Sequence, residues 1–183
     1  MNKALKILLF TNGLVLVAGA MLGPIYALFV DRIGGSLLDA SFAGGIFALS
    51  AGIMSIISGK FSDSIKESEL VVVLGYMLMG IGFISYIFVG SIWTLFAVEI
   101  LFGLSVAIYA PAFDAAYSKH LNKKKAGSQW GAWESMNYFT AAVGALIGGF
   151  VVTYLGFNVL FVIMAILCWF SGIYIYFLPR KVL

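Results

Sequence analysis

Residues 70–118 read LVVVLGYMLMGIGFISYIFVGSIWTLFAVEILFGLSVAIYAPAFDAAYS and consist of two long apolar runs separated only by Gly90-Ser91. A helix needs about 20 apolar residues to cross a hydrocarbon core about 30 Å thick, because each residue adds a rise of roughly 1.5 Å. Each run is long enough for one crossing. The stretch therefore predicts two successive membrane-spanning helices.

The rest of the chain divides in the same way. Hydrophobic residues make up 62% of the 183 residues and charged residues only 10%, whereas a soluble domain is about 45–50% apolar. Charged and turn residues cut the sequence into six apolar pieces, so we expect one all-α integral membrane domain over residues 1–183, embedded in a lipid bilayer. The expected helices are residues 7–30, 40–59, 70–90, 92–118, 129–155 and 158–178.

The basic residues predict the orientation of these helices. Short loops rich in Lys and Arg stay on the cytoplasmic side, and with six helices only Arg32 falls on the other side. We therefore expect a multi-pass protein of the cell membrane with both termini in the cytoplasm. The basic residues form no face that could follow phosphates, so no nucleic-acid partner is expected. The residues on the cytoplasmic side are Lys3, Lys6, Lys60, Lys66, Lys119, Lys123, Lys124, Lys125, Arg180 and Lys181.

A weak internal repeat relates the first three helices to the last three. Pro24 and Pro111 each lie in the later part of the first helix of a triplet. Because each triplet has an odd number of helices, such a repeat is inverted in the membrane, as in many secondary transporters. The expected fold is a 3+3 inverted repeat. Three identities support an offset of 90 residues, namely Ala51 with Ala141, Ile57 with Ile147 and Gly59 with Gly149.

Three acids lie within the expected helices, namely Glu99, Asp114 and Glu134. A carboxylate in hydrocarbon costs at least about 2.5 kcal/mol, so an acid at membrane depth faces the bundle interior, a wet cavity or a partner. Glu99 lies about two turns from the outer end of its helix, and we hypothesise that it binds a proton or cation during transport. The alternative is a hydrogen-bonded structural acid. Asp114 and Glu134 lie near the cytoplasmic side, where contact with water or with nearby lysines is the simpler interpretation.

Enzymatic functions find no support in the sequence. The one histidine, His120, lies beside a lysine cluster, and the one cysteine, Cys168, lies in an apolar run. The chain has no Gly-x-Ser-x-Gly elbow, no phosphate-binding glycine loop and no His/Cys cluster for a metal. We expect no catalytic residues, no cofactor and no metal.

The junction of the second and third helices carries a family motif. Residues 59–66 read GKFSDSIK, which resembles the loop signature of the major facilitator superfamily, where Gly-x-x-x-Asp is followed by basic residues at this corner. Gly59 and Asp63 match the motif. Ser64 stands where the family usually has arginine, and Glu67-Ser68 replaces the closing basic pair.

Two further stretches resemble the same family, so that the resemblance covers the whole chain. Residues 99–107 are similar to the fourth-helix signature, with Glu99 in place of the usual arginine. Residues 144–149 are similar to the fifth-helix glycine signature, with Ala145 in place of the proline of the antiporter version. For that reason the sequence does not indicate antiport.

The resemblance implies the amino-terminal six-helix half of a secondary active transporter. Members of that superfamily normally have two six-helix halves with the solute cavity between them. It therefore implies a small-molecule solute and a second six-helix half, from the same or another chain. The sequence leaves open a fragment, a half-length protein that dimerises, or an inactive product.

Three functions remain in competition. The leading hypothesis is a small-solute carrier, with proton-coupled export as its specific form, in which Asn12, Tyr109 and Glu99 line the path and Asp114 and Glu134 are further candidates. The second is a substrate-binding membrane subunit of an ATPase-driven vitamin uptake complex. The third is a membrane scaffold without transport activity.

Overall fold

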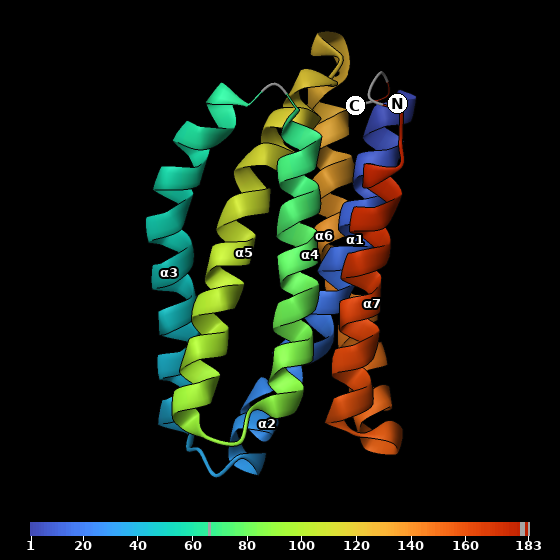
Figure 1. The fold of residues 1–183 in the computed structure, drawn as a ribbon. Coiled ribbons are helices and arrows are strands. Elements are labelled where there is room, and N and C mark those ends of the chain that lie inside the picture. Colours follow the sequence, from blue (N-terminus) through green and yellow to red (C-terminus); the bar gives the residue numbers. More distant parts are fainter. Residues whose placement is uncertain (66, 180–181, 183) are drawn as a thin grey trace.

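The structure is a computed structural model that describes residues 1–65, 67–179 and 182, and for residues 61–64 it describes the backbone alone. The described residues form helices and no strands (Figure 1). Three short 3-10 turns interrupt or join them: η1 (Gly23–Ile25), η2 (Tyr86–Phe88) and η3 (Lys123–Lys125). The α-helices are α1 (Lys3–Leu22), α2 (Tyr26–Arg32), α3 (Leu37–Ser64), α4 (Ser68–Ser85), α5 (Ile92–Lys119), α6 (Ala126–Leu155) and α7 (Phe157–Tyr176).

The described residues contain six helical spans that are long and apolar enough to cross a membrane. This confirms the predicted all-α membrane fold with six crossings. The first crossing is not one straight helix, because η1 separates α1 from α2 at Gly23–Ile25. Pro24 cannot donate a backbone hydrogen bond, which favours a break at this point. The spans are Lys3–Arg32, Leu37–Lys60, Ser68–Phe88, Ile92–Lys119, Lys123–Leu155 and Phe157–Tyr176.

The second helix is longer than the sequence predicts. It was expected to end at residue 59, but α3 continues to Ser64. Gly59 and Asp63 therefore lie in the final turns of a helix and not in a loop. A glycine in a helix costs only about 1 kcal/mol relative to alanine, so Gly59 alone does not end the helix. The side chain of Asp63 lies outside the part of the chain that the structure describes.

The helices alternate in direction, so the start of α1 and the ends of α3, α5 and α7 lie at one end of the bundle (Figure 1). We call this the lysine-rich end, because every described lysine lies in or beside these helix termini or in η3. Arg32 lies at the opposite end, where α2 ends. The charge separation expected from the sequence is therefore present in the fold.

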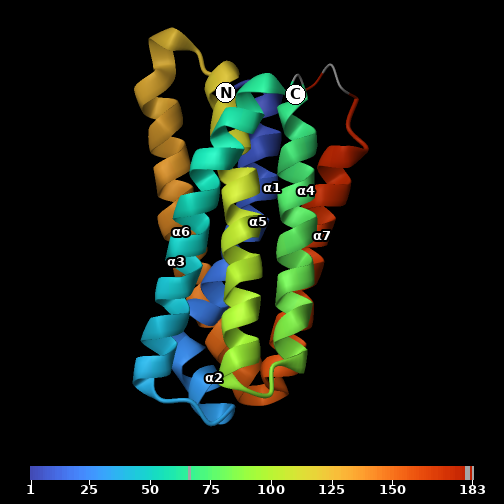
Figure 2. The same ribbon diagram turned by 60° about the vertical axis from the view of Figure 1, so that its left-hand side comes forward.

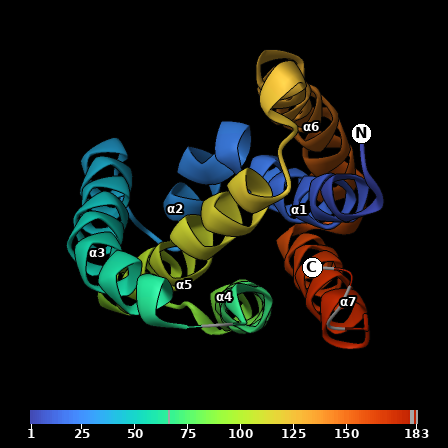
Figure 3. The ribbon, with the colours of Figure 1, turned by 90° about the horizontal axis from the view of Figure 1, so that it is seen from above.

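The contacts between helices follow the inverted repeat. Helix α5 lies between α3 and α4 (Figure 2), and α1 packs against α6 and α7. Exchanging α1 with α5, α3 with α6 and α4 with α7 leaves these main contacts unchanged, because α4 also packs against α7. The smaller contact between α6 and α7 has no counterpart of similar size between α3 and α4. Seen from above, α3 and α6 stand at opposite ends of the bundle with α1 and α5 between them (Figure 3).

Two of the main helix pairs pack most closely at glycines. A Cβ atom added at Gly103 of α5 would lie 2.7 Å from the carbonyl oxygen of Phe47 in α3. A Cβ atom added at Gly148 of α6 would clash with the carbonyl group of Met21 in α1. Small residues allow helix backbones to pack closely where lipid supplies no hydrophobic drive for association. These two seams are equivalent in the repeat.

Candidate functional site: a carboxylate in an aromatic cavity

A cavity of about 410 Å³ lies among α1, α3, α4 and α5 and is open to the surface. Its walls are mostly aromatic and aliphatic side chains. Glu99 is the one carboxylate that lines it among the described residues. The lining residues are Gly19, Leu22, Gly23, Tyr26, Gly44, Phe47, Met79, Phe83, Tyr86, Glu99, Phe102 and Val106.

Two tyrosine hydroxyl groups hold the carboxylate of Glu99. The Tyr26 hydroxyl and the Tyr86 hydroxyl each donate a hydrogen bond of 2.6 Å to Oε1 of Glu99. The side chain of Glu99 is only 5% exposed. No described residue bonds Oε2, so this oxygen still has acceptor capacity. These two hydrogen bonds fix the carboxyl group at the cavity wall.

The break in the first crossing places Tyr26 at this site, because Tyr26 is the first residue of α2 after η1. Tyr86 begins η2 at the end of α4, and its ring stacks on Phe102 at 5.2 Å and on Phe161 at 5.1 Å between ring centroids. These stacked rings fix the direction of the Tyr86 hydroxyl. Tyr26, Tyr86 and Glu99 thus join α2, η2 and α5 through one carboxylate oxygen.

Sequence reasoning singled out Glu99 but missed both tyrosines. Their positions in the sequence were the one clue that could have pointed to them. Tyr26 follows Pro24 by two residues, and Tyr86 lies near the end of an apolar run. Tyrosines near helix ends are ordinarily assigned to the membrane interface. Their contact with Glu99 depends on the packing of three segments, which a pattern in one segment does not contain.

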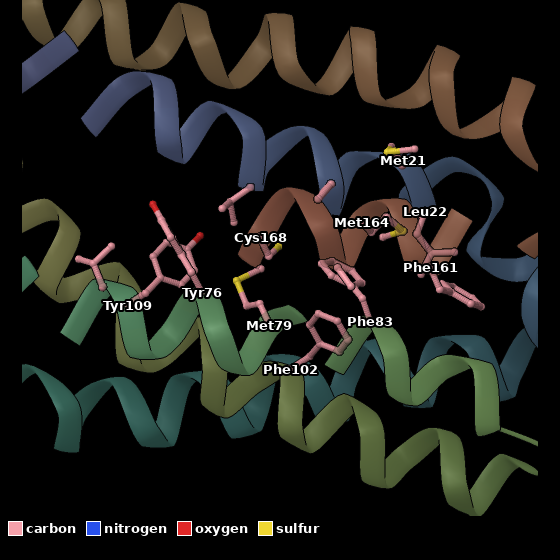
Figure 4. Close-up of a cluster of buried hydrophobic side chains, with 14 of the residues drawn as sticks. Met21, Leu22, Tyr76, Met79, Phe83, Phe102, Tyr109, Phe161, Met164 and Cys168 are labelled. Carbon is pink, nitrogen blue, oxygen red and sulfur yellow. The ribbon is translucent and has the colours of Figure 1, made fainter. Parts of the chain in front are cut away.

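A second polar cluster lies nearer the lysine-rich end. Asn12 is fully buried, and its Oδ1 accepts a 2.8 Å hydrogen bond from the Tyr76 hydroxyl. The rings of Tyr76 and Tyr109 lie 5.2 Å apart, and Figure 4 shows them side by side at one end of the buried cluster that also contains Met79 and Cys168. Asn12 and Tyr109 were expected to line the path, but neither lines the cavity beside Glu99. The Nδ2 atom of Asn12 has no hydrogen-bond partner among the described residues.

Asn12 and Glu99 occupy equivalent positions in the two triplets. Asn12 precedes Pro24 by the same number of residues as Glu99 precedes Pro111. Their hydrogen-bond partners do not follow the exchange of α4 with α7, because Tyr76, which donates to Asn12, and Tyr86, which donates to Glu99, both belong to the α4 segment. Each triplet thus contributes one buried polar group, but the two groups have different surroundings.

The other candidate residues lie on the surface. Asp114 and Glu134 are exposed, and neither side chain makes a hydrogen bond within the part of the chain that is described. Their neighbours Phe113 and Trp133 contact each other with ring centroids 5.0 Å apart, which brings the segments that carry the two acids together. A Cβ atom added at Gly59 would have no atom within 4 Å.

Six membrane-spanning helices in an inverted repeat, with a buried carboxylate beside a solute-sized cavity, define a polytopic helical membrane protein with a candidate solute site. A family model described as Major Facilitator Superfamily matches residues 8–182. The chain belongs to this superfamily, as its motifs predict.

Several curated proteins are similar to the chain. Multidrug resistance protein MdtG of Proteus mirabilis is 29% identical over 182 residues, which cover 94% of this chain and 44% of MdtG. Proton-coupled antiporter flippase LtaA of Staphylococcus epidermidis is 22% identical over 142 residues, which cover 76% of this chain and 35% of LtaA. The uncharacterized MFS-type transporter YitZ of Bacillus subtilis is 24% identical over 156 residues, which cover 85% of this chain and 94% of YitZ.

The chain spans less than half the length of MdtG and LtaA, but nearly all of YitZ matches it. YitZ and LtaA are described as transporters, and MdtG as a multidrug resistance protein. Membership in this superfamily supports transport over the vitamin-uptake subunit and the scaffold that the sequence left open.

Proposed function

We propose that the chain takes part in the secondary active transport of a small solute and that Glu99 exchanges a proton in each cycle. The observation that carries this proposal is the single carboxylate of Glu99 at the wall of an otherwise apolar cavity, held by Tyr26 and Tyr86. An ionisable residue at membrane depth marks a substrate, ion or proton pathway by default. The relatives MdtG, a multidrug resistance protein, and LtaA, a proton-coupled antiporter flippase, also support this proposal.

The cavity favours an organic solute with an apolar or aromatic body. Its volume of about 410 Å³ falls within the range of roughly 300–1,000 Å³ that small-molecule sites occupy. Phe47, Phe83 and Phe102 offer ring surfaces, and the carboxylate of Glu99 offers one negative charge. A solute and a proton that both interact with this carboxylate exclude each other, which gives a physical basis for exchange.

Protonation of Glu99 also acts on the helices. The ionised carboxylate holds α2 through Tyr26 and η2 through Tyr86 by charge-assisted hydrogen bonds. Adding a proton removes the charge and weakens both links. The relative stability of two helix arrangements therefore changes with the proton, which is what coupling requires.

Three further assignments belong to this proposal. The lysine-rich end lies in the cytoplasm, because short basic loops stay on that side. The transport cavity requires a second six-helix half, from the same or another chain. Asn12 and Tyr109, as well as Asp114 and Glu134 at the lysine-rich end, mark the remainder of the path between the cavity and the cytoplasm.

The test is transport by the purified chain in proteoliposomes, with the fluorescent aromatic cation ethidium as the probe. An acidic lumen drives ethidium inward in exchange for protons, and we expect Glu99→Gln to remove the dependence of uptake on the pH gradient. Asp31→Asn is the matched control, because Asp31 is an exposed acid of α2 away from the cavity. Equal pH dependence of uptake in the Glu99→Gln variant would refute the role of Glu99 in proton exchange. Uptake no faster than in protein-free liposomes would refute transport by this chain alone.

A further inference from the structure

The junction of α5 and α6 carries the densest group of positive charges in the described part of the chain. Lys119 ends α5, and the three lysines of η3 (Lys123–Lys125) directly precede α6. All four side chains are exposed. Residues 115–133 contain no acidic residue, and the nearest acids in sequence, Asp114 and Glu134, lie further into the two helices. The junction therefore presents positive charge that no neighbouring acid in the sequence balances.

The backbone of this junction is held by contacts that leave the lysine side chains free. Oδ1 of Asn122 accepts a 3.0 Å hydrogen bond from the backbone N–H of Lys124 and so caps η3. The side-chain oxygen of the buried Gln129 accepts a 2.8 Å hydrogen bond from the N–H of Asn122. The Tyr117 hydroxyl of α5 donates a 2.6 Å hydrogen bond to the Gln129 carbonyl of α6. These contacts give the lysines a defined backbone on which to stand.

The start of α1 lies at the same end of the bundle (Figure 1) and adds two lysines to this group. Nδ2 of Asn2 donates a 3.0 Å hydrogen bond to the carbonyl of His120. Because Lys3 follows Asn2 and Lys119 precedes His120, this bond brings the two lysines together, and Lys6 lies one turn further along α1. Among the described residues, none of the six ammonium groups forms an ion pair or a hydrogen bond. We call these residues the basic surface, namely Lys3, Lys6, Lys119, Lys123, Lys124 and Lys125.

The length of α6 places the basic surface at the level of lipid headgroups. Its 30 residues span about 45 Å at a rise of roughly 1.5 Å each, and a bilayer with its headgroup regions is about 40–45 Å thick. The lysines of η3 therefore lie at the membrane surface and not far beyond it. Phe139 and Leu146 of the same helix are 71% and 77% exposed and offer apolar contact to acyl chains.

We propose that the basic surface binds the anionic headgroup of a phospholipid. Ammonium groups bind phosphate oxygens as point charges, and clusters of about four to eight lysines or arginines beside a membrane helix recognise anionic lipids. Orientation in the membrane requires only that lysines lie on one side. It does not require the hydrogen bonds that gather lysines from α1, α5 and η3.

Native mass spectrometry of the detergent-purified chain, titrated with lipid, measures this binding. The two probes are phosphatidylglycerol, which is anionic, and phosphatidylcholine, which carries the same phosphate but no net charge. We expect the unmodified chain to bind phosphatidylglycerol at least about tenfold more tightly, because the basic surface recognises net negative charge. A chain in detergent has no orientation in a membrane, so the result is independent of topology.

Two variants with the same net charge locate the binding site. Lys123→Gln with Lys124→Gln removes two charges from the basic surface, and we expect phosphatidylglycerol to bind at least about tenfold more weakly. Arg32→Gln with Lys60→Gln is the matched control, because Arg32 ends α2 at the opposite end of the bundle and Lys60 belongs to α3. We expect the control to bind phosphatidylglycerol within about twofold of the unmodified chain.

A third variant separates loss of charge from loss of structure. Lys123→Arg with Lys124→Arg keeps both charges, and we expect it to keep the preference for phosphatidylglycerol. Equal binding of the two lipids by the unmodified chain, an equal loss of binding in both glutamine pairs, or loss of binding in the arginine pair overturns the proposal.

Competition distinguishes a lipid from other anionic partners. Half-maximal displacement of phosphatidylglycerol by inorganic phosphate, or by a glutamate-rich peptide, at or below the concentration of the lipid overturns lipid binding. The first result assigns the basic surface to a soluble phosphate compound and the second to an acidic protein. The inference does not involve Glu99 or the cavity, so we expect Glu99→Gln to bind phosphatidylglycerol as the unmodified chain does.

Discussion

At the scale of single residues, the molecule contains two buried polar side chains in equivalent positions with different hydrogen bonding. Glu99 accepts hydrogen bonds from two tyrosine hydroxyl groups at Oε1 and lines the cavity. Asn12 receives one from Tyr76 and lies in packed surroundings, with Nδ2 unpaired among the described residues. A buried group without a partner retains a desolvation penalty of about 1–3 kcal/mol. Glu99 therefore has the features of a functional site, whereas Asn12 keeps an unused hydrogen-bond donor in this conformation.

The contact between Asn12 and Tyr76 gives a stability prediction. Asn12→Leu removes the unpaired Nδ2 but leaves the buried Tyr76 hydroxyl without its acceptor, and we expect this stranded hydroxyl to cost about 1–3 kcal/mol in the free energy of unfolding. Tyr76→Phe in the same chain removes the stranded hydroxyl, so the double variant recovers most of this loss. Unfolding in mixed micelles followed by circular dichroism measures both. A double variant less stable than Asn12→Leu would contradict this account of the pair.

At the scale of elements, hydropathy and charge predicted more than the local motifs did. The apolar runs predicted all six crossings, because a membrane span requires a minimum apolar length whatever its neighbours are. The end of α3 at Ser64 and the break at η1 were not predicted. Helix ends and kinks depend on capping and on neighbouring segments, and the contacts of Tyr26 and Tyr86 with Glu99 follow from that packing.

Two adjacent glycines of α6 provide a matched test of helix packing. Gly148 touches the backbone of Met21 in α1, whereas a Cβ atom added at Gly149 meets nothing within 4 Å. We expect Gly148→Ala to lower the free energy of unfolding by about 1–3 kcal/mol through overpacking. Gly149→Ala should be neutral or stabilising by up to about 1 kcal/mol, because alanine is the better helix former. Equal effects of the two substitutions would show that the α1–α6 seam is not as close as described.

At the scale of the whole molecule, the basic residues predict the orientation in the membrane. The lysine-rich end should face the cytoplasm. In a Cys168→Ala background, we expect Lys123→Cys to be protected from a membrane-impermeant maleimide in intact cells and Ser91→Cys to be labelled. The two residues lie at opposite ends of the bundle. Labelling of Lys123→Cys with protection of Ser91→Cys would reverse the proposed topology.

For the molecule as a whole, the sequence predicted the superfamily but not the cavity. The order of motifs predicted the superfamily, and the family match over residues 8–182 confirms it. Glu99 stands out in sequence because it departs from the usual arginine of its motif and because burying an acid is unfavourable. The cavity beside it depends on the packing of α1, α3, α4 and α5, which sequence patterns in separate helices do not reveal.

Proton release on solute binding shows whether Glu99 carries the proton that exchanges with solute. Ethidium is added to the detergent-purified chain in weakly buffered solution, and released protons are followed with a pH indicator. At a pH low enough for Glu99 to carry a proton, we expect the unmodified chain and Asp31→Asn to release protons as ethidium binds, whereas Glu99→Gln releases almost none. Undiminished proton release by Glu99→Gln, with ethidium bound, would show that a group other than Glu99 carries the proton.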